Sequence, residues 1–314
     1  MDTSAQPRRT GPAAAETLPQ PVMSPFAEFP AQGVLPGWRE AGAGRPLLCL
    51  HGWSIPGTAF SGQAALARRG WRVIAPDHAG HGLSRSLPGA ARADIGRLAA
   101  DAAALIAHLG LDDVVVVGWS LGATTAWRLM QDHPEVPLAA VAAIDMTPRL
   151  LSAPDWPHGL RGGYSADQVE QMAVRVRQDW PGLAPAVAAD LWAAGSAPSP
   201  AAAELVAHGQ QHCDPLALSS LWRDMAAQDL RQALRHARLP LLLLHGERSR
   251  LYGPAMAAAV GTLNPATLQC SIAATGHSPH LERPAAFNAA LLALLDRAGV
   301  RFSRATSAPQ ESRR

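Results

Sequence analysis

The chain has 314 residues, of which 48% are hydrophobic and 17% charged, so it is long enough for one large or two small domains with a substantial core. Its formal net charge is only +2, and it carries no dense basic stripe, which argues against a nucleic-acid partner. No stretch approaches the ~18 continuous apolar residues of a membrane span, so we expect none.

Both ends of the chain are predicted to be disordered tails, at residues 1–33 and 301–314. The first is rich in Pro, Ala and Gln. No apolar segment follows Arg8 and Arg9, so a twin-arginine export signal would lack its hydrophobic part.

The cysteines favour free thiols over disulfides. They are odd in number and far apart, and two of them lie in apolar runs (Cys49, Cys213 and Cys270). Free thiols fit a reducing compartment, and we therefore expect a cytoplasmic protein.

Short apolar runs bounded by Gly, Pro or Asp predict strands that are buried on both faces, as in a parallel sheet. They lie at residues 46–50, 71–75, 114–117, 138–144, 241–244 and 268–272. Helical patterns occur at residues 94–108, 120–131 and 284–297. This alternation predicts an α/β fold with a mostly parallel central sheet flanked by helices.

The alternation stops between about residues 148 and 235, where helical stretches and Pro/Gly breaks replace the strand-like runs. We predict a helical cap at 148–235, inserted into a core of residues 34–147 and 236–300. Ligands bind at the carboxyl ends of the strands in such sheets, so the cap would shape the pocket and exclude water. Its tryptophans are more typical of packing than of substrate contacts (Trp156, Trp180, Trp192 and Trp222).

A nucleophile is predicted directly after the run of valines at 114–117. The sequence there is Gly-Trp-Ser-Leu-Gly, residues 118–122. A buried strand that ends in Gly-x-Ser-x-Gly and enters a helix forms a strained turn that exposes the serine hydroxyl. Ser120 is the predicted nucleophile.

A serine hydroxyl becomes a good nucleophile only when a neighbouring base takes its proton. His277 is the candidate base, because it follows the last predicted strand and precedes the C-terminal helix, as the order Ser, acid, His requires. His280, three residues further on, is the nearby rival.

The oxyanion that forms during acyl transfer needs two backbone N–H donors. We expect one from Leu121, at the positive end of the helix that begins near Ser120. We expect the other from Trp53, in the loop that follows the strand ending at Leu50.

Taken together, these motifs resemble those of α/β-hydrolases, from about Gly37 to Arg297. The resemblance rests on His-Gly-Trp at 51–53, Asp-His-Ala-Gly-His-Gly-Leu-Ser at 77–84, the serine motif at 118–122 and Gly-His at 276–277. The first and third motifs especially resemble those of pimeloyl-acyl-carrier-protein methyl ester esterases. The segments 144–149, 155–156 and 162–165 are similar to related bacterial hydrolases whose substrates are poorly defined.

The resemblance fails at one position. Most of the family carries an acid after the strand before the last, in a Gly-x-x-Asp pattern, and this chain has Ser249 there. Asp145, which ends the strand after the nucleophile's helix, is the preferred substitute. In some α/β-hydrolases, including certain haloalkane dehalogenases, the acid lies at the end of that strand. Glu247 and the absence of any triad carboxylate remain open alternatives.

A metal site is conceivable at His51, His78 and His81, but no carboxylate or cysteine completes a ligand set there. We expect neither a metal nor a cofactor.

The sequence therefore predicts a serine hydrolase that cleaves a small alkyl ester or lactone through an acyl-enzyme, with an acyl carrier protein as a conceivable carrier of the substrate. Basic cap residues would suit such an acidic carrier, although solvated helix faces explain them as well (Arg161, Arg175 and Arg177). The alternatives are a non-hydrolytic protein of the same fold (a binding protein, a lyase or an acyltransferase) and a cofactor-free haloperoxidase-like activity.

Overall fold

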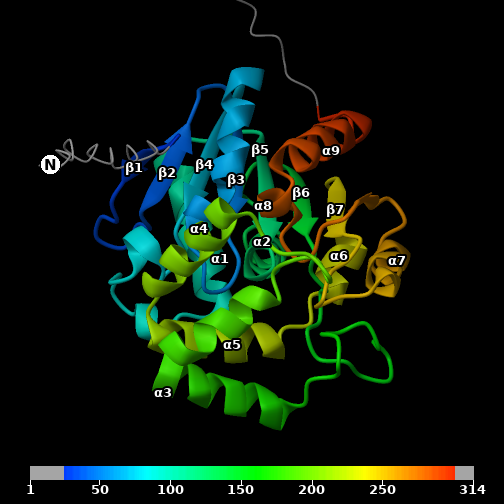
Figure 1. Cartoon of the computed structure of the whole chain (residues 1–314). Helices are drawn as coiled ribbons and strands as arrows, with labels where there is room; N and C mark the ends of the chain where they lie inside the picture. Colours follow the sequence, from blue (N-terminus) through cyan, green and yellow to red (C-terminus); the bar gives the residue numbers. More distant parts are fainter. Residues whose placement is uncertain (1–24, 301–314) are drawn as a thin grey trace, which may run out of the picture.

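The computed structural model describes residues 25–300, and these residues form an eight-stranded sheet flanked by helices (Figure 1). The strand order is β1-β2-β4-β3-β5-β6-β7-β8, with antiparallel pairing only at β1–β2 and β2–β4. The strands are β1 (Ala27–Phe29), β2 (Trp38–Ala41), β3 (Arg45–Leu50), β4 (Trp71–Pro76), β5 (Val114–Trp119), β6 (Leu138–Ile144), β7 (Leu241–Gly246) and β8 (Leu268–Ile272).

Side chains on successive residues of the central strands enter two separate cores, one on each face of the sheet. In β3, Leu48 and Leu50 belong to one core, and Leu47 and Cys49 belong to the other; all four are fully buried. Burial on both faces explains why these strands are continuous apolar runs rather than alternating ones. The predicted fold class is confirmed.

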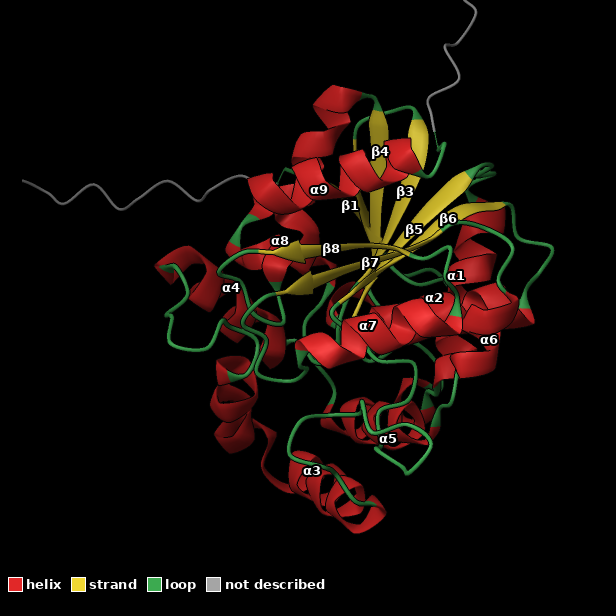
Figure 2. Ribbon diagram, turned by 90° about the vertical axis from the view of Figure 1, so that its right-hand side faces the viewer, coloured by secondary structure: helices red, strands yellow, loops and turns green. Residues whose placement is uncertain are grey.

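Helices cover both faces of the sheet, and Figure 2 shows α2 and α9 on opposite sides of it. Leu98 of α1 packs in the core of one face, whereas Phe60 of η1 and Phe287 of α9 pack in that of the other. The helices outside the insertion are η1 (Gly57–Arg69), η2 (Gly82–Ser84), η3 (Ala90–Arg92), α1 (Ile95–His108), α2 (Leu121–Asp132), α7 (Pro254–Leu263), α8 (Pro279–Glu282) and α9 (Pro284–Arg297).

A helical insertion lies between β6 and β7, at one end of the sheet (Figure 1). It contains α3 (Ala166–Ala189), α4 (Pro200–Gln211), α5 (Pro215–Ala227) and α6 (Arg231–His236). Ser165 and Gln168 form a capping box at the start of α3. The helix breaks at Asp179, where φ is −150°, shortly before Pro181, which cannot donate a helical hydrogen bond.

The amino-terminal edge of the sheet differs from the sequence prediction. Strand β1 lies within residues 1–33, the segment expected to be a tail, and Phe29 stacks on Trp38 of β2 with ring centroids 4.8 Å apart. The remainder of that expected tail, residues 1–24, and the one at 301–314 lie outside the described residues.

The three cysteines are free thiols in the structure. Among residues 25–300, no helix combines the length and the apolar character that crossing a membrane requires.

Candidate active site

Ser120 lies at the sharp turn between β5 and α2, in a strained backbone conformation with φ 52° and ψ −115°. The two glycines of the motif allow the turn to form. A Cβ on Gly122 would lie 1.9 Å from the carbonyl oxygen of Leu50, and one on Gly118 would lie 2.2 Å from that of Gly122. Ser120 itself is only half-buried, so its hydroxyl is within reach of a substrate.

His277 lies in the loop between β8 and α8, and its backbone is anchored to the serine turn. The indole N–H of Trp119 donates a hydrogen bond of 2.8 Å to the carbonyl oxygen of His277. The carboxylate of Glu282 accepts from the N–H of Gly276 at 2.6 Å and from that of Ala193 at 2.9 Å, which links the insertion to the same loop.

The rival histidine, His280, lies in α8, the helix that follows this loop. It is fully buried between the rings of Phe60 and Trp119, and burial lowers its pKa to about 3. A neutral ring enclosed among aromatic side chains is typical of a packing element, and His280 does not line the cavity that Ser120 and His277 share.

Asp145 directly follows β6, and its carboxylate Oδ2 lies 2.7 Å from Nδ1 of His277. Both side chains are buried. The backbone of Asp145 is in the left-handed region with φ 44°, which Asp tolerates better than most residues. Its N–H donates to the carbonyl oxygen of Leu244 in β7 at 2.9 Å, so the pairing of the two strands holds the residue.

Ser249, at the position where the family pattern places the acid, also contacts Asp145. Its hydroxyl donates to Oδ2 of Asp145 at 2.7 Å. Glu247, the other candidate acid, is exposed and accepts from the backbone N–H of Ala274 at 3.1 Å. The structure thus brings Ser249, Asp145 and His277 together, and directs Glu247 elsewhere.

The two candidate oxyanion donors lie at the ends of adjacent strands. Leu121 is the first residue of α2, whose leading N–H groups have no partner within the helix. Trp53 follows β3, and its indole N–H donates to the carbonyl oxygen of Leu218 in α5 at 2.9 Å, which ties its loop to the insertion. Gly52 permits close approach, since a Cβ there would lie 2.8 Å from the ring of Trp119.

Two buried histidines hold the loop that carries Trp53. Nε2 of His51 accepts from the N–H of His78 at 2.8 Å, and its Nδ1 donates to the carbonyl oxygen of Gly52, also at 2.8 Å. Nε2 of His81 accepts from the N–H of Ser54 at 3.2 Å. Because these nitrogens bind the backbone, they are not available to a metal. No set of His, Cys, Asp and Glu within residues 25–300 is arranged to hold a metal ion.

Because these histidines are buried in the folded protein, acid should destabilise the fold. Burial lowers the pKa of His78 to about 3 and that of His81 to about 4. The unfolded chain, with histidine pKa values of about 6.5, takes up protons first as the pH falls. The free energy of unfolding should decrease from about pH 6.5 towards the folded-state pKa values, and calorimetric melting at graded pH measures it.

The matched variant is His81→Gln, whose amide oxygen can still accept from Ser54. Its melting temperature should fall less steeply with acidification than that of the wild type, because one fewer histidine takes up a proton on unfolding. Parallel slopes for the two proteins would contradict this role of His81.

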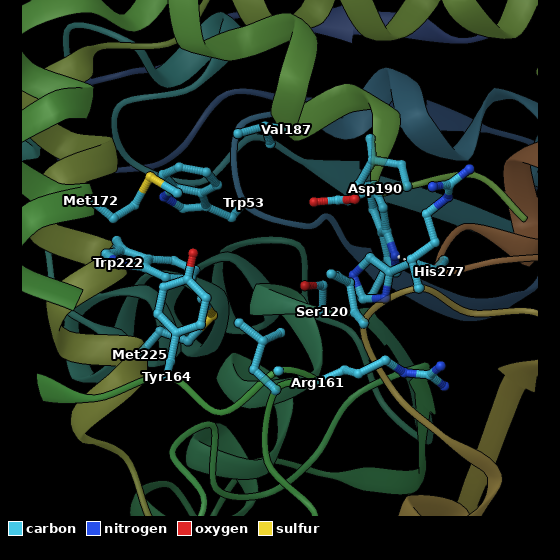
Figure 3. A pocket seen from close by; sticks show the side chains of 16 residues that line it. Trp53, Ser120, Arg161, Tyr164, Met172, Val187, Asp190, Trp222, Met225 and His277 are labelled. Carbon is cyan, nitrogen blue, oxygen red and sulfur yellow. Dashed lines mark hydrogen bonds between the residues drawn. The ribbon is translucent and has the colours of Figure 1, made fainter. Parts of the chain in front are cut away.

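A cavity of about 350 Å³ opens beside Ser120 and His277. Figure 3 shows Trp53, Met172 and Trp222 on one side of it, and Ser120 and His277 on the other. Of the four cap tryptophans, only Trp222 is among the residues that line it. The lining residues are Trp53, Trp119, Ser120, Leu160, Arg161, Gly162, Tyr164, Met172, Val187, Asp190, Leu191, Trp222, Met225, Arg250, Leu251 and His277.

A family model described as the alpha/beta hydrolase family matches residues 47–290. The chain belongs to the alpha/beta hydrolase family. This hydrolase is 30% identical over 247 residues to the pimeloyl-acyl-carrier-protein methyl ester esterase of Aromatoleum aromaticum, a match that covers 76% of this chain and 93% of that protein.

Two further comparisons show less: the first covers only part of each chain, and the second has low sequence identity. The hydrolase is 40% identical over 115 residues to a non-heme haloperoxidase of Rhodococcus erythropolis, which covers 36% of this chain and only 41% of that protein. Its structure is similar to that of an esterase from Exiguobacterium antarcticum, with a TM-score of 0.75 and 21% identity over 83% of this chain and 96% of that one. At this identity the second likeness concerns the fold alone.

Several residues of the hydrolase's site were not predicted from its sequence. The sequence identifies Ser249 only as the position where the expected family acid is absent. Asp190 and Arg250, which both line the pocket, belong to none of the motifs in the sequence. Trp119 lies inside the serine motif, but nothing in the motif indicates that its indole would anchor His277.

Proposed function

We propose that this alpha/beta hydrolase cleaves a carboxylic ester through a covalent acyl-enzyme, with Ser120 as the nucleophile. One observation carries the proposal: the buried 2.7 Å contact between Asp145 and Nδ1 of His277, beside a pocket that both Ser120 and His277 line. A ring that donates from Nδ1 to a carboxylate keeps a lone pair on Nε2. That nitrogen can accept the proton of the serine hydroxyl.

The proposed reaction has two halves. In the first, the oxygen of Ser120 bonds to the ester carbonyl carbon while its proton moves to His277. The backbone N–H groups of Trp53 and Leu121 stabilise the oxyanion. The carbon–oxygen bond to the alcohol then breaks, and His277 returns the proton to the departing alkoxide.

In the second half, water attacks the acyl-enzyme, and His277 accepts a proton from that water. The bond to Ser120 breaks, the serine recovers its proton, and a carboxylic acid leaves. Asp145 orients the imidazole and stabilises its cationic form throughout.

The lining of the pocket favours a substrate whose larger part is an apolar acyl group. Trp53, Met172, Trp222 and Met225 line it, and apolar walls with few polar groups are typical of sites for small organic ligands. The relative from Aromatoleum aromaticum is named as a methyl ester esterase of an acyl-carrier-protein conjugate. We therefore propose a small alkyl ester or a lactone, with an acyl chain that is free or attached to an acyl carrier protein.

The test combines turnover with covalent labelling. The protein is incubated with p-nitrophenyl esters of increasing acyl length, and separately with an alkyl fluorophosphonate. We expect nitrophenol release and one phosphonyl adduct, located on Ser120 by peptide mass spectrometry. Absence of both release and adduct would overturn the proposal and favour a non-hydrolytic protein of the same fold.

The haloperoxidase relative motivates a second candidate, oxidation of halides without a cofactor. The same serine would serve this activity. Bromination assayed with peroxide, bromide and acetate should then vanish in Ser120→Ala. Bromination that persists in Ser120→Ala would separate this activity from the ester site.

Replacing Trp222 with alanine should shift the preferred acyl chain towards greater length. The indole lines the pocket and packs against Trp53, with ring centroids 5.4 Å apart. Its removal therefore enlarges the pocket on its apolar side. We expect kcat/KM for the best wild-type ester to fall by about tenfold, while longer esters gain relative to it.

The control is Leu216→Ala on the same helix, α5. Leu216 is 50% exposed and does not line the pocket, so its substitution should leave the chain-length profile unchanged. An unchanged profile in Trp222→Ala as well would show that the substrate does not contact this wall.

A further inference from the structure

Ser249 is buried, with 4% of its surface exposed, three residues after the end of β7. Its side chain has one polar atom, and that atom lies 2.7 Å from Oδ2 of Asp145. Packing alone does not require a buried hydroxyl in hydrogen-bond contact with the carboxylate that binds His277. The contact therefore points to a specific role for Ser249.

The direction of the hydroxyl proton follows from the other contacts of Ser249. A hydroxyl group has one hydrogen to donate and two lone pairs that accept. The backbone N–H groups of Leu251 and Tyr252 both point at Oγ of Ser249, each at 3.3 Å. These two donors occupy the lone pairs, so the single proton must point at the carboxylate of Asp145.

Oδ2 of Asp145 consequently receives two donors, the hydroxyl of Ser249 and Nδ1–H of His277, each at 2.7 Å. The torsion that rotates an aspartate carboxylate is broad and weakly restrained. The hydrogen bond from His277 alone would leave that rotation less well determined. A second donor, fixed to the backbone after β7, determines which oxygen faces the histidine.

We propose that Ser249 is a positioning residue for the reaction. Its hydroxyl holds the Asp145 carboxylate in the rotation that accepts the His277 proton, and it acts on His277 only through Asp145. The inference rests on the proposed function for its kinetic consequences. Its structural content, the link from Ser249 to the His277–Asp145 hydrogen bond, does not depend on any substrate.

The kinetic test uses three substitutions of Ser249. Ser249→Ala removes the donor, and Ser249→Cys keeps nearly the same volume with a weak donor. Both should lower kcat for a p-nitrophenyl ester by about 10- to 100-fold, as expected for a lost hydrogen bond to a charged group. KM should stay within about twofold, since Ser249 is not in the pocket wall. Ser249→Thr retains the hydroxyl and should recover most of the activity.

A double variant tests whether the effect passes through Asp145. In the Asp145→Asn background, adding Ser249→Ala should lower kcat by no more than about twofold, because the carboxylate that Ser249 orients is already gone. Losses that multiply in the double variant would overturn the proposal. So would wild-type kcat in both Ser249→Ala and Ser249→Cys.

A spectroscopic measurement separates this inference from the proposed function. The imidazole N–H proton of a histidine bound to a carboxylate gives a far-downfield proton NMR signal, assigned here by its loss in His277→Gln. We expect the signal to shift or broaden in Ser249→Ala and Ser249→Cys, and to return in Ser249→Thr. An unchanged signal in the first two variants would contradict the inference even if the enzyme hydrolyses esters. A changed signal would support it even if no tested ester is a substrate.

Discussion

Ser120→Ala should lower kcat/KM for p-nitrophenyl esters by a factor on the order of 10⁶, the scale at which removal of a triad serine leaves only binding and oxyanion stabilisation. The first bond of the proposed mechanism forms to the oxygen of this hydroxyl, and every later step passes through the acyl-enzyme that results. Alanine removes one oxygen atom and adds no bulk at the strained turn, where φ is 52°. Rates are measured with the ester that the wild type turns over fastest, and circular dichroism checks the fold.

The matched control is Ser278→Ala, in the loop that carries His277. Ser278 is fully buried, and its hydroxyl has no hydrogen-bond partner among the described residues. Its loss should leave turnover within about twofold of the wild type. If Ser120→Ala retained more than about one per cent of the wild-type rate, another nucleophile would have to be sought.

Asp145→Asn should lower kcat by about 10⁴-fold, because asparagine favours the wrong tautomer of the histidine and cannot stabilise its cationic form. The substitution suits the site in other respects. Asparagine tolerates a backbone with φ 44° and keeps nearly the same shape, so the fold should persist.

The comparison variant is Glu247→Gln. Glu247 is exposed and hydrogen-bonds the backbone of Ala274, so we expect turnover within about twofold of the wild type. A large loss in Glu247→Gln, together with an active Asp145→Asn, would transfer the role of the acid to Glu247. Steady-state kinetics on both purified variants decides between them.

The parallel part of the sheet was predictable from the sequence because burial on both faces leaves a simple pattern, as at residues 114–117. The antiparallel edge was not. In β2, Arg39 and Glu40 interrupt any apolar run, although Arg39 is buried against Asp77 with a contact of 2.7 Å. From the sequence alone, a charged residue that is buried in an ion pair cannot be distinguished from an exposed one.

The serine turn and the late histidine carry strong local motifs, so Ser120 and His277 could be named in advance as candidates. The surroundings of Asp145 could not. Its contacts with Ser249 and with Leu244 depend on β6 and β7 lying side by side, although the whole helical insertion separates them in the chain. Neighbouring strands are a property of the sheet topology, which no short motif encodes.

The location of Asp145 has a consequence for how this pocket can change. If the acid stood at position 249, where the family resemblance leads one to expect it, the loop after β7 would have to preserve a catalytic group. Here Asp145 extends directly from β6, and the loop after β7 contributes Arg250 and Leu251 to the pocket wall. Substitutions at these two positions alter the wall without removing a proposed triad member. Libraries of variants at residues 250 and 251 are therefore a direct route to new substrate ranges, provided that Ser249 is retained.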